Sequence, residues 1–400
     1  MNNLGKHNKI RLKIMTSGII ASLFSLFQKK DADLIIFNSF FNLQFNSNTK
    51  HFFLFLLQQK DILGITIKYV INDDLLRKKL QTLYGDYFIE TNSFKGKIFA
   101  LKAKTWLLNS YELPVGGIFL NRGRNIVCLS HGSPIKNEGT LEKDVGFIKR
   151  IYYRILHTNI SYMLATASAF ANVYSKYLNL PMRKILISGL PQFDQLSVVP
   201  KNVDFFDSMA FNILYAPTWR HYGNPSLFDF DDFDIFDFSK FLKTNNIKIW
   251  LRLHPNFEDS VISGFSNIEN IKEFSGKKFP DIMEYLSLFD GLITDYSSIC
   301  LDYLPLNRPM FFMTSDYEMY DKEIGFCVDY NHWTPGYKPH TYKDFKISIL
   351  DAIGKDSFKR QREAVMHEYS CRIDGNCANL LDLLINEGIV NTVNGKEGEN

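Results

Sequence analysis

The sequence predicts an α/β protein with two parallel sheets, and three observations lead to this fold class. Short apolar runs of strand length alternate with stretches of helical spacing, a pattern typical of parallel strands joined by helices. The chain has 400 residues, which is more than one hydrophobic core usually serves, so two domains are expected. A Pro-Lys-Asn stretch at 200–202 suits the linker between them.

Strands are expected where short apolar runs are bounded by turn residues. In the first half these runs are 33–37, 64–70, 98–101, 106–108, 126–129 and 185–189. In the second half they are 212–216, 248–253, 291–294 and 310–313, with helices expected at 238–243, 281–289 and 299–304. The polar, Gly-containing end, 388–400, is expected to be a flexible tail.

Composition excludes several classes of protein. The balance of 46 Lys and Arg against 43 Asp and Glu is too even to indicate a nucleic-acid binder. Five cysteines without a CxxC pair favour a reduced, cytoplasmic compartment. No cluster has metal-ligand spacing, and the acidic run 229–234 fits a solvated loop better than a metal-binding DxD motif. Neither GxGxxG nor GxxxxGK[ST] occurs, so no cofactor is predicted.

The N-terminal segment, 1–30, is basic and partly apolar. Its apolar stretch, 14–27, is too short to span a bilayer and contains several polar residues. No small-residue cleavage site follows it, which argues against a signal peptide. Helical spacing leaves two interpretations: an amphipathic helix on an anionic membrane, or a first helix packed on the protein body. The residues with this spacing are Leu12, Met15, Ile19, Leu23 and Leu26.

The segment 290–303 combines a buried strand with a serine pair. Gly291–Thr294 is the strand, and Ser297 and Ser298 open the helix that follows. Hydroxyls at a helix start, beside free backbone N–H groups, suit a phosphate, although an ordinary helix cap explains them equally well. Asp302, four residues beyond Ser298, lies on the same helical face.

Three further motifs stand at expected strand ends. His131 follows the strand 126–129 and is suited to general base catalysis near neutral pH, while the alternative is a structural turn histidine. The turn 215–220, YAPTWR, presents groups suited to nucleotide recognition. Arg252 and His254 share one face of a strand, and burying both without an anion between them would be unfavourable.

Taken in order, HGSPIK, GLPQFD, YAPTWR, RLHPN and DGLITDYSSICLDYLPLNRPMFF resemble the CDP-glycerol glycerophosphotransferase family. This family includes teichoic acid primases and polymerases and related capsule enzymes. The resemblance covers 33–383, and the order and spacing of five motifs make it specific.

The resemblance implies a GT-B-like architecture, with two Rossmann-type domains facing a central cleft. Segment 31–200 is then the acceptor-side domain and 205–387 the CDP-donor domain. The implied reaction transfers a polyol phosphate, most simply glycerol phosphate, from a CDP-activated donor to an acceptor hydroxyl and releases CMP.

The resemblance also assigns roles to residues. His131 resembles the catalytic base, and His254 would act with the serine pair on the pyrophosphate. Gln192 stands where the family has the Arg of its GxPR turn, which leaves glycerol, ribitol or another polyol open. The implied donor-binding positions are Gly132, Ser133, Pro134, Ile135, Gln192, Pro217, Thr218, Arg252, Leu253, Ser297, Ser298 and Asp302.

The expected partners are CDP-glycerol or a related CDP-polyol, a lipid-linked oligosaccharide or growing polyol-phosphate polymer, and an anionic membrane surface. The expected place is the cytoplasmic face of the cell membrane, with peripheral attachment. Two alternatives remain open from the sequence: a GT-B glycosyltransferase that uses a nucleotide sugar, and a non-catalytic membrane scaffold.

Overall fold

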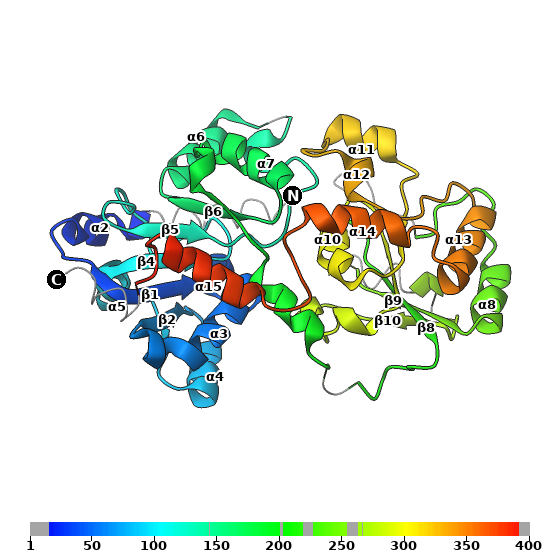
Figure 1. Ribbon diagram of the computed structural model, residues 1–400, viewed down its shortest axis with the longest axis horizontal. Coiled ribbons are helices and arrows are strands. Elements are labelled where there is room, and N and C mark those ends of the chain that lie inside the picture. Colours follow the sequence, from blue (N-terminus) through cyan, green and yellow to red (C-terminus); the bar gives the residue numbers. More distant parts are fainter. Residues whose placement is uncertain are drawn as a thin grey trace. The chain divides into compact units, whose positions relative to one another are not determined.

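The computed structural model describes residues 16–143, 145–200, 203–218, 227–253, 263–265 and 267–391. It divides the chain into two compact units (Figure 1). Unit 1 comprises Met1–His131, Val145–Asp194 and Gly375–Asn400, and unit 2 comprises Gly132–Asp144 and Gln195–Asp374.

Unit 1 is built on a parallel sheet of seven strands in the order β3-β2-β1-β4-β5-β6-β7. The strands are β1 (Asp31–Asn38), β2 (Thr66–Val70), β3 (Phe88–Ile89), β4 (Ala103–Leu108), β5 (Asn125–Cys128), β6 (Tyr162–Ala165) and β7 (Ile185–Ile187). Its helices are α2 (Ile19–Ser25), α3 (Ser47–Leu63), α4 (Asp74–Tyr84), α5 (Phe94–Lys102), α6 (Phe147–His157), α7 (Ser168–Leu178) and α15 (Asn376–Asn386). Because the central strands are covered on both faces, they consist almost entirely of buried apolar residues.

Unit 2 is built on a parallel sheet of five strands in the order β10-β9-β8-β11-β12. The strands are β8 (Phe211–Tyr215), β9 (Ile247–Leu251), β10 (Ile271–Glu273), β11 (Gly291–Thr294) and β12 (Met310–Phe312). The helices are α8 (Ile235–Thr244), α10 (Ile299–Tyr303), α11 (Tyr317–Glu323), α12 (Tyr330–Trp333), α13 (Tyr342–Gly354) and α14 (Lys359–Glu368). Both units therefore have the α/β architecture that the sequence predicts.

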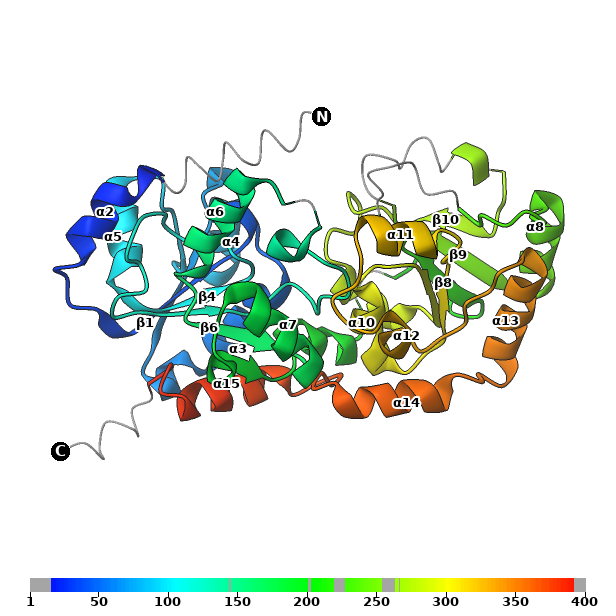
Figure 2. The ribbon, with the colours of Figure 1, turned by 90° about the horizontal axis from the view of Figure 1, so that it is seen from above.

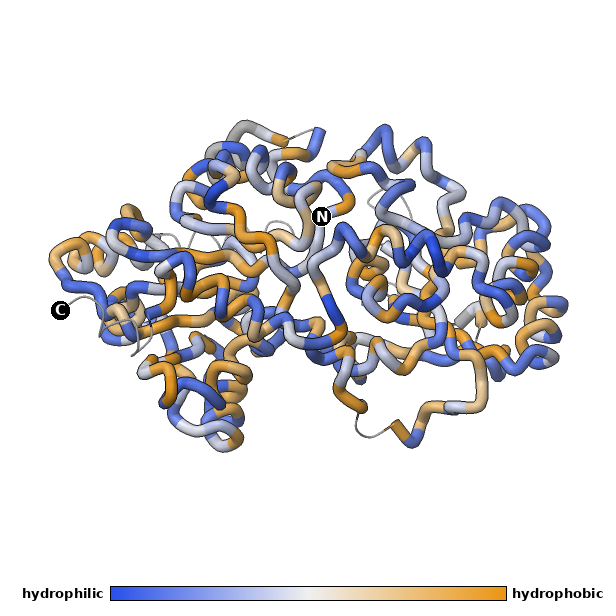
Figure 3. Tube along the Cα trace, viewed as in Figure 1, coloured by the Kyte–Doolittle hydropathy of each residue, from blue (hydrophilic) through white to orange (hydrophobic). Residues whose placement is uncertain are grey.

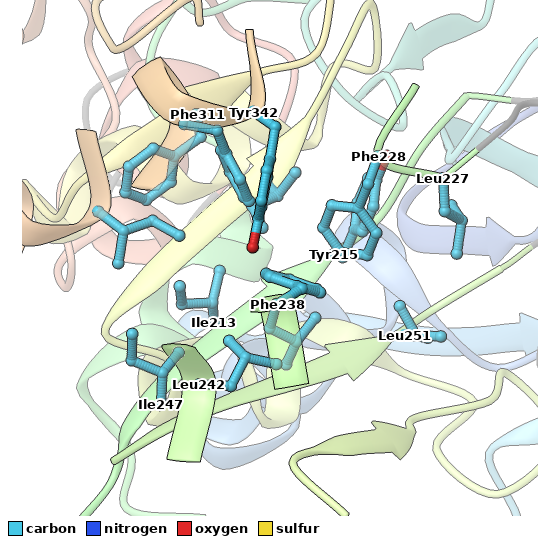
Figure 4. Close-up of a cluster of buried hydrophobic side chains, with 14 of the residues drawn as sticks. Ile213, Tyr215, Leu227, Phe228, Phe238, Leu242, Ile247, Leu251, Phe311 and Tyr342 are labelled. Atoms are coloured by element: carbon cyan, nitrogen blue, oxygen red, sulfur yellow. The ribbon is translucent and has the colours of Figure 1, made fainter. Parts of the chain in front are cut away.

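One core of unit 2 lies between its sheet and the helices α8 and α13. Figure 4 shows Ile213 and Tyr215 of β8 facing Phe238 of α8 and Tyr342 of α13. Aromatic rings fill much of this space, and Phe228 stacks on Phe233 with a centroid distance of 5.7 Å. The high phenylalanine content of the chain thus contributes directly to core packing.

Two predicted elements are wrong. The run 98–101, predicted as a strand, lies in α5, because Ser93 caps a helix there by accepting a hydrogen bond from the backbone N–H of Gly96 at 3.0 Å. The stretch 281–289, predicted as one helix, forms two short 3₁₀ turns, Ile282–Glu284 and Leu286–Leu288. Tyr285 between them has ψ of −8° and φ of −126°, which is outside the helical region.

The predicted domain boundaries also need correction. Residues 132–144 belong to unit 2 and not to the first domain, because this segment hydrogen-bonds along 324–327. The N–H of Cys327 donates to the carbonyl of Ile135 at 2.9 Å, and the N–H of Asn137 donates to Gly325 at 3.0 Å. The boundary near residue 200 falls between Asp194 and Gln195.

The C-terminal helix α15 belongs to unit 1 and not to the second domain. The carboxylate of Asp194 caps it, accepting from the backbone N–H groups of Asn376 at 2.7 Å and Cys377 at 2.9 Å. The predicted flexible tail is wrong for 388–391. Ile389 and Val390 are buried, and the Ile389 carbonyl accepts from the hydroxyl of Thr105 on β4 at 2.9 Å; residues 392–400 lie outside the described ones.

Helix α2 packs with its small residues inward. A Cβ atom at Gly18 would come within 1.8 Å of the carbonyl oxygen of Gly116, and one at Gly117 within 2.4 Å of Ser22 Oγ. That hydroxyl accepts a hydrogen bond from the backbone N–H of Ile118 at 3.1 Å. The close approach buries Ala21, Ser22 and Ser25, and α2 lies beside α5 in both ribbon views (Figures 1 and 2).

The large apolar residues of α2 therefore face outward. Ile20 is 76% exposed, Phe24 59% and Phe27, just beyond the helix, 92%. Ile118 and Phe119 of the loop that holds α2 are exposed as well, and the hydrophobic residues of α2 appear orange in Figure 3. Leu12 and Met15 of the predicted periodic set lie outside the described residues. Among the described helices, none is long and apolar enough to cross a membrane.

Candidate functional site

Three neighbouring strands of unit 2 end in the motifs that the sequence singles out. β9, β8 and β11 are adjacent and parallel, so their carboxyl ends meet at one edge of the sheet. RLHP follows β9, APT follows β8 and DYSS follows β11. Ligands of open α/β sheets bind outside the carboxyl ends of strands, so this edge is the candidate binding site of unit 2.

Asp295 joins two of these motifs. Its carboxylate accepts the backbone N–H of Thr218 through both oxygens, at 2.9 and 3.0 Å, and the N–H of Tyr296 at 2.6 Å. The residue is 2% exposed. On the preceding residue, the hydroxyl of Thr294 donates to the carbonyl of Ala216 at 2.8 Å. The APT turn, with Pro217 and Thr218 half-buried, is thus held against the DYSS segment by a buried carboxylate.

The serine pair lies where β11 passes into α10. Ser298 is the N-cap residue of this helix by position, but its side chain makes no capping hydrogen bond, and its backbone is already helical, with φ of −64° and ψ of −7°. Ser297 Oγ accepts from the N–H of Ile299 at a long 3.4 Å. Capping therefore accounts poorly for Ser298, whose half-buried hydroxyl remains available to a ligand.

The segment after His131 brings a fourth motif to the same edge of unit 2. A Cβ atom placed on Gly132 would lie 3.6 Å from Ser298 Oγ, so the HGSP and DYSS motifs are neighbours. The next residue, Ser133, is buried, and its hydroxyl lies 3.2 Å from the phenolic oxygen of Tyr369. Pro134 is half-buried and Ile135 is buried against the rest of unit 2.

Tyr369 lies next to Ser133 of the HGSP motif. Complete burial raises the pKa of its phenol well above the ordinary value, and the charge of nearby Asp302 acts in the same direction. Tyr369 therefore remains a neutral hydrogen-bonding group next to Ser133. Asp302, whose charge acts on Tyr369, belongs to α10 one helical turn after Ser298.

Arg252 and Leu253 follow β9 and have different surroundings. The Arg252 guanidinium donates to the carbonyl of Phe279 at 2.8 Å and lies 5.9 Å from the ring centroid of Phe274. Leu253 is 6% exposed and belongs to the core of unit 2, so its side chain contributes packing. His254 lies outside the described residues, as do Trp219 and Arg220.

His131 is the last residue of unit 1 and lies beyond the carboxyl end of β5. Its side chain is exposed, as a general base requires. Pairing of β4 and β5 continues past β5, since the N–H of Leu129 donates to the carbonyl of Leu108 at 2.7 Å. Ser130, which lies between Leu129 and His131 in the chain, has a left-handed backbone with φ of 62°.

Gln192, which the resemblance places among the donor-binding positions, is held by the start of α3. It is 3% exposed, and its side-chain oxygen accepts from the hydroxyl of Ser47 at 2.9 Å. Its backbone N–H donates to the side chain of Asn48 at 3.1 Å. Within unit 1, the GLPQ turn is therefore tied to the start of α3.

Sequence reasoning missed Asp295, Asn48 and Tyr369. Asp295 stands inside a recognised motif, and its position directly after a buried strand could have marked it as a residue that binds a neighbouring turn. Asn48 and Tyr369 lie far from every motif in sequence, and nothing in the local pattern indicates them. Among the described residues, no group of three His, Cys, Asp or Glu could hold a metal ion.

Comparisons with known proteins agree with this picture. The two α/β units, with motifs at the carboxyl ends of their strands, have the architecture of a GT-B-type protein. Residues 20–384 match the family model of CDP-Glycerol:Poly(glycerophosphate) glycerophosphotransferase. The chain belongs to this family, which confirms the resemblance, and it is a transferase of the glycerophosphotransferase type.

Two relatives cover nearly the whole chain. The teichoic acid poly(glycerol phosphate) polymerase of Bacillus spizizenii is 26% identical over 387 residues, which is 92% of this chain and 93% of the relative. The teichoic acid glycerol-phosphate transferase of Staphylococcus aureus is 23% identical over 379 residues, 86% of this chain and 90% of the relative.

Solved structures match the fold. The wall teichoic acid polymerase TagF superimposes with a TM-score of 0.70 at 21% identity, covering 95% of this chain and 94% of that chain. A UDP-GlcNAc 2-epimerase from Neisseria meningitidis gives a TM-score of 0.52 at 10% identity, covering 88% and 100%. The first of these matches confirms the predicted GT-B-type fold.

Proposed function

We propose that this transferase moves glycerol phosphate from CDP-glycerol to a hydroxyl of a polymeric or lipid-linked acceptor at the cytoplasmic membrane face. The observation that carries the donor assignment is the meeting of four motifs in unit 2. Asp295 fixes the APT turn against DYSS, and Gly132 lies against Ser298. The identity of the transferred group, glycerol phosphate, is inferred from two relatives, a teichoic acid poly(glycerol phosphate) polymerase and a teichoic acid glycerol-phosphate transferase.

The proposed chemistry is a phosphoryl transfer between oxygen atoms. His131 accepts the proton of the acceptor hydroxyl, whose oxygen attacks the phosphorus that bears glycerol. A new P–O bond forms, and the bond from that phosphorus to the bridging oxygen breaks. The bridging oxygen leaves with its electron pair as part of CMP.

In this proposal the donor phosphates contact hydroxyl and backbone donors of unit 2. Ser297 and Ser298 donate to the pyrophosphate, and Gly132 and Ser133 line the same position. The nucleotide lies between Pro217, Thr218 and the backbone of Leu253, with Arg252 nearby. His254, the second proposed catalytic residue, acts with the serine pair on the pyrophosphate, a role that rests on the family resemblance.

Product analysis tests the proposed reaction. Purified protein is incubated with a glycerol-phosphate oligomer and one donor at a time: CDP-glycerol, CDP-ribitol or UDP-N-acetylglucosamine. CMP released from CDP-glycerol with elongation of the oligomer supports the proposal. Release of UDP with no CMP from either CDP donor would show a glycosyltransferase instead.

Ser298→Ala separates a phosphate contact from a helix cap. Because the Ser298 hydroxyl makes no capping bond, the variant is expected to keep its stability within about 0.5 kcal/mol. Loss of a hydrogen bond to a charged phosphate, worth about 1.5 kcal/mol, is expected to raise KM for CDP-glycerol about tenfold. Steady-state kinetics and thermal unfolding measure the two effects.

The control is Asp234→Ala, which removes a true cap in unit 2. Asp234 accepts from the N–H groups of Phe236 and Asp237 at the start of α8. This variant is expected to lose about 1 kcal/mol of stability with an unchanged KM. Ser298→Ala behaving like Asp234→Ala would contradict the phosphate contact.

We also propose that the outward face of α2 binds an anionic membrane. Ile20, Phe24 and Phe27 present large side chains to solvent beside exposed Phe119. Exposed cations accompany them on the same unit: Lys29 follows α2, while Lys95 and Lys102 belong to the adjacent α5. A helix that combines an apolar face with neighbouring cations is typical of an interfacial membrane anchor.

The double variant Phe24→Ser/Phe27→Ser is expected to weaken binding to phosphatidylglycerol-containing vesicles about 100-fold, since each buried phenyl group contributes well over 1 kcal/mol. Vesicle sedimentation measures the change, and neutral phosphatidylcholine vesicles show the electrostatic part. Phe236→Ser on α8, which removes an equally exposed ring from unit 2, is the matched control. Equal sedimentation of all three proteins would rule out α2 as the anchor.

A further inference from the structure

Ser130, the residue directly before His131, has a backbone conformation that serine rarely adopts. Its φ of 62° lies in the left-handed region, where a Cβ atom is unfavourable. Such residues persist only where surrounding contacts hold them, and they are frequent at active sites. This left-handed residue lies between the end of β5 and His131, so it directs the chain toward His131.

Two side chains from other elements hold Ser130. Asn48, in the first turn of α3, donates its side-chain N–H to the Ser130 carbonyl at 2.8 Å. Tyr174, on α7, lies with its phenolic oxygen 2.8 Å from Ser130 Oγ. All three residues are buried, so water does not compete easily for these bonds.

Asn48 is itself fixed at both ends of its amide. Its oxygen accepts from the backbone N–H of Gln192 at 3.1 Å, while its nitrogen donates to Ser130. The residue before it, Ser47, is also left-handed, with φ of 58°, and donates its hydroxyl to the Gln192 side chain at 2.9 Å. One carbonyl partner and one N–H partner therefore define the orientation of the Asn48 amide.

We propose that Asn48 is a positioning residue for His131, and that Gln192 acts on His131 through Asn48. Asn48 connects the turn after β7 to the end of β5 and holds Ser130 left-handed. This inference rests on the proposed role of His131 as the base.

The variant Asn48→Asp tests the donor half of this amide. An aspartate keeps an oxygen for the Gln192 N–H but turns a second oxygen toward the Ser130 carbonyl, so the bond to Ser130 is replaced by repulsion. Displacement of a catalytic group by about 1 Å can lower a rate about 100-fold. We expect kcat to fall by about that factor, with KM for CDP-glycerol changed less than twofold.

A second substitution separates positioning from general structural damage. Glycine adopts the left-handed region without the Cβ penalty, so Ser130→Gly reduces the need for the Asn48 bond. The double variant Asn48→Asp/Ser130→Gly is expected to regain at least tenfold of the lost kcat. A purely structural role for Asn48 predicts no such recovery.

The matched control is Asn72→Asp. Asn72 follows β2 at the same sheet edge and bridges to Thr91 through both ends of its amide, with the Thr91 N–H at 2.7 Å and the Thr91 hydroxyl at 3.2 Å. It has no bond to Ser130, so its variant should keep kcat.

The outcomes distinguish this inference from the proposed function. If the wild-type protein releases no CMP from CDP-glycerol, the proposed function fails. If the wild type is active and Asn48→Asp keeps its kcat, or loses it without recovery in the double variant, only the positioning role is overturned. A rise in the KM for CDP-glycerol at unchanged kcat would also overturn it, since that would place Asn48 in donor binding.

Discussion

Replacing His131 by glutamine is expected to lower kcat for glycerol-phosphate transfer by about 10²–10⁴-fold, the range in which general base catalysis contributes. Glutamine keeps the approximate size and hydrogen-bonding capacity of the side chain but cannot accept the acceptor proton at neutral pH. Because the side chain is exposed, its removal should leave the unfolding temperature unchanged. Initial rates of CMP release measure the effect.

Donor binding provides the accompanying measurement for this variant. In the proposal, CDP-glycerol contacts unit 2, so its Kd for His131→Gln should equal that of the wild type in equilibrium binding. His332→Gln is the control, since His332 is a surface histidine paired with Glu368 at 3.1 Å. A His131→Gln enzyme that keeps more than a tenth of the wild-type rate would exclude His131 as the base.

Asp295→Ala is expected to reduce both stability and donor binding. The substitution removes the acceptor of two backbone N–H groups, that of half-buried Thr218 and that of buried Tyr296. Each unsatisfied group costs about 1–3 kcal/mol, so the free energy of unfolding should fall by about 2–6 kcal/mol. Release of the APT turn from DYSS should raise KM for CDP-glycerol at least tenfold as well.

Asp290 offers a matched control at the opposite end of β11. Its carboxylate accepts the backbone N–H of Asn212 at 2.9 Å, where β8 and β11 begin. Asp290→Ala is expected to lose about 1–3 kcal/mol of stability but to keep the donor KM, because it lies at the amino edge of the sheet. Urea unfolding and kinetics on both variants give the comparison; equal KM changes would mean that Asp295 acts through stability alone.

The positions of most strands could be predicted because parallel strands buried on both faces are short apolar runs. Gly291–Thr294 matches its predicted range at both ends, and the other central strands differ by a few residues. The run 98–101 fails because four apolar residues fit a buried helix as well as a strand. Only the cap at Ser93, outside that window, distinguishes the two.

The motifs of unit 2 could be placed from the sequence because the carboxyl ends of parallel strands lie at one edge of the sheet, whatever the order of the strands. What could not be predicted are contacts between distant segments. Residues 132–144 belong to unit 2 because they hydrogen-bond with 324–327. Helix α15 belongs to unit 1 because the Asp194 carboxylate accepts hydrogen bonds from its first turn. The clamp of Asn48 on Ser130 joins residues 82 positions apart and leaves no periodic signal in the sequence.

Helix α2 packs through its small residues and exposes its large apolar ones, so its attachment to unit 1 and the character of its exposed face depend on different residues. Gly18, Ser22 and Ser25 attach the helix to unit 1, whereas Ile20, Phe24 and Phe27 point away from it. Substitutions of the outward residues change no core contact, so the membrane affinity proposed for this face can change without loss of stability. Substitutions of the inward residues have the reverse character, since almost any larger side chain would detach the helix.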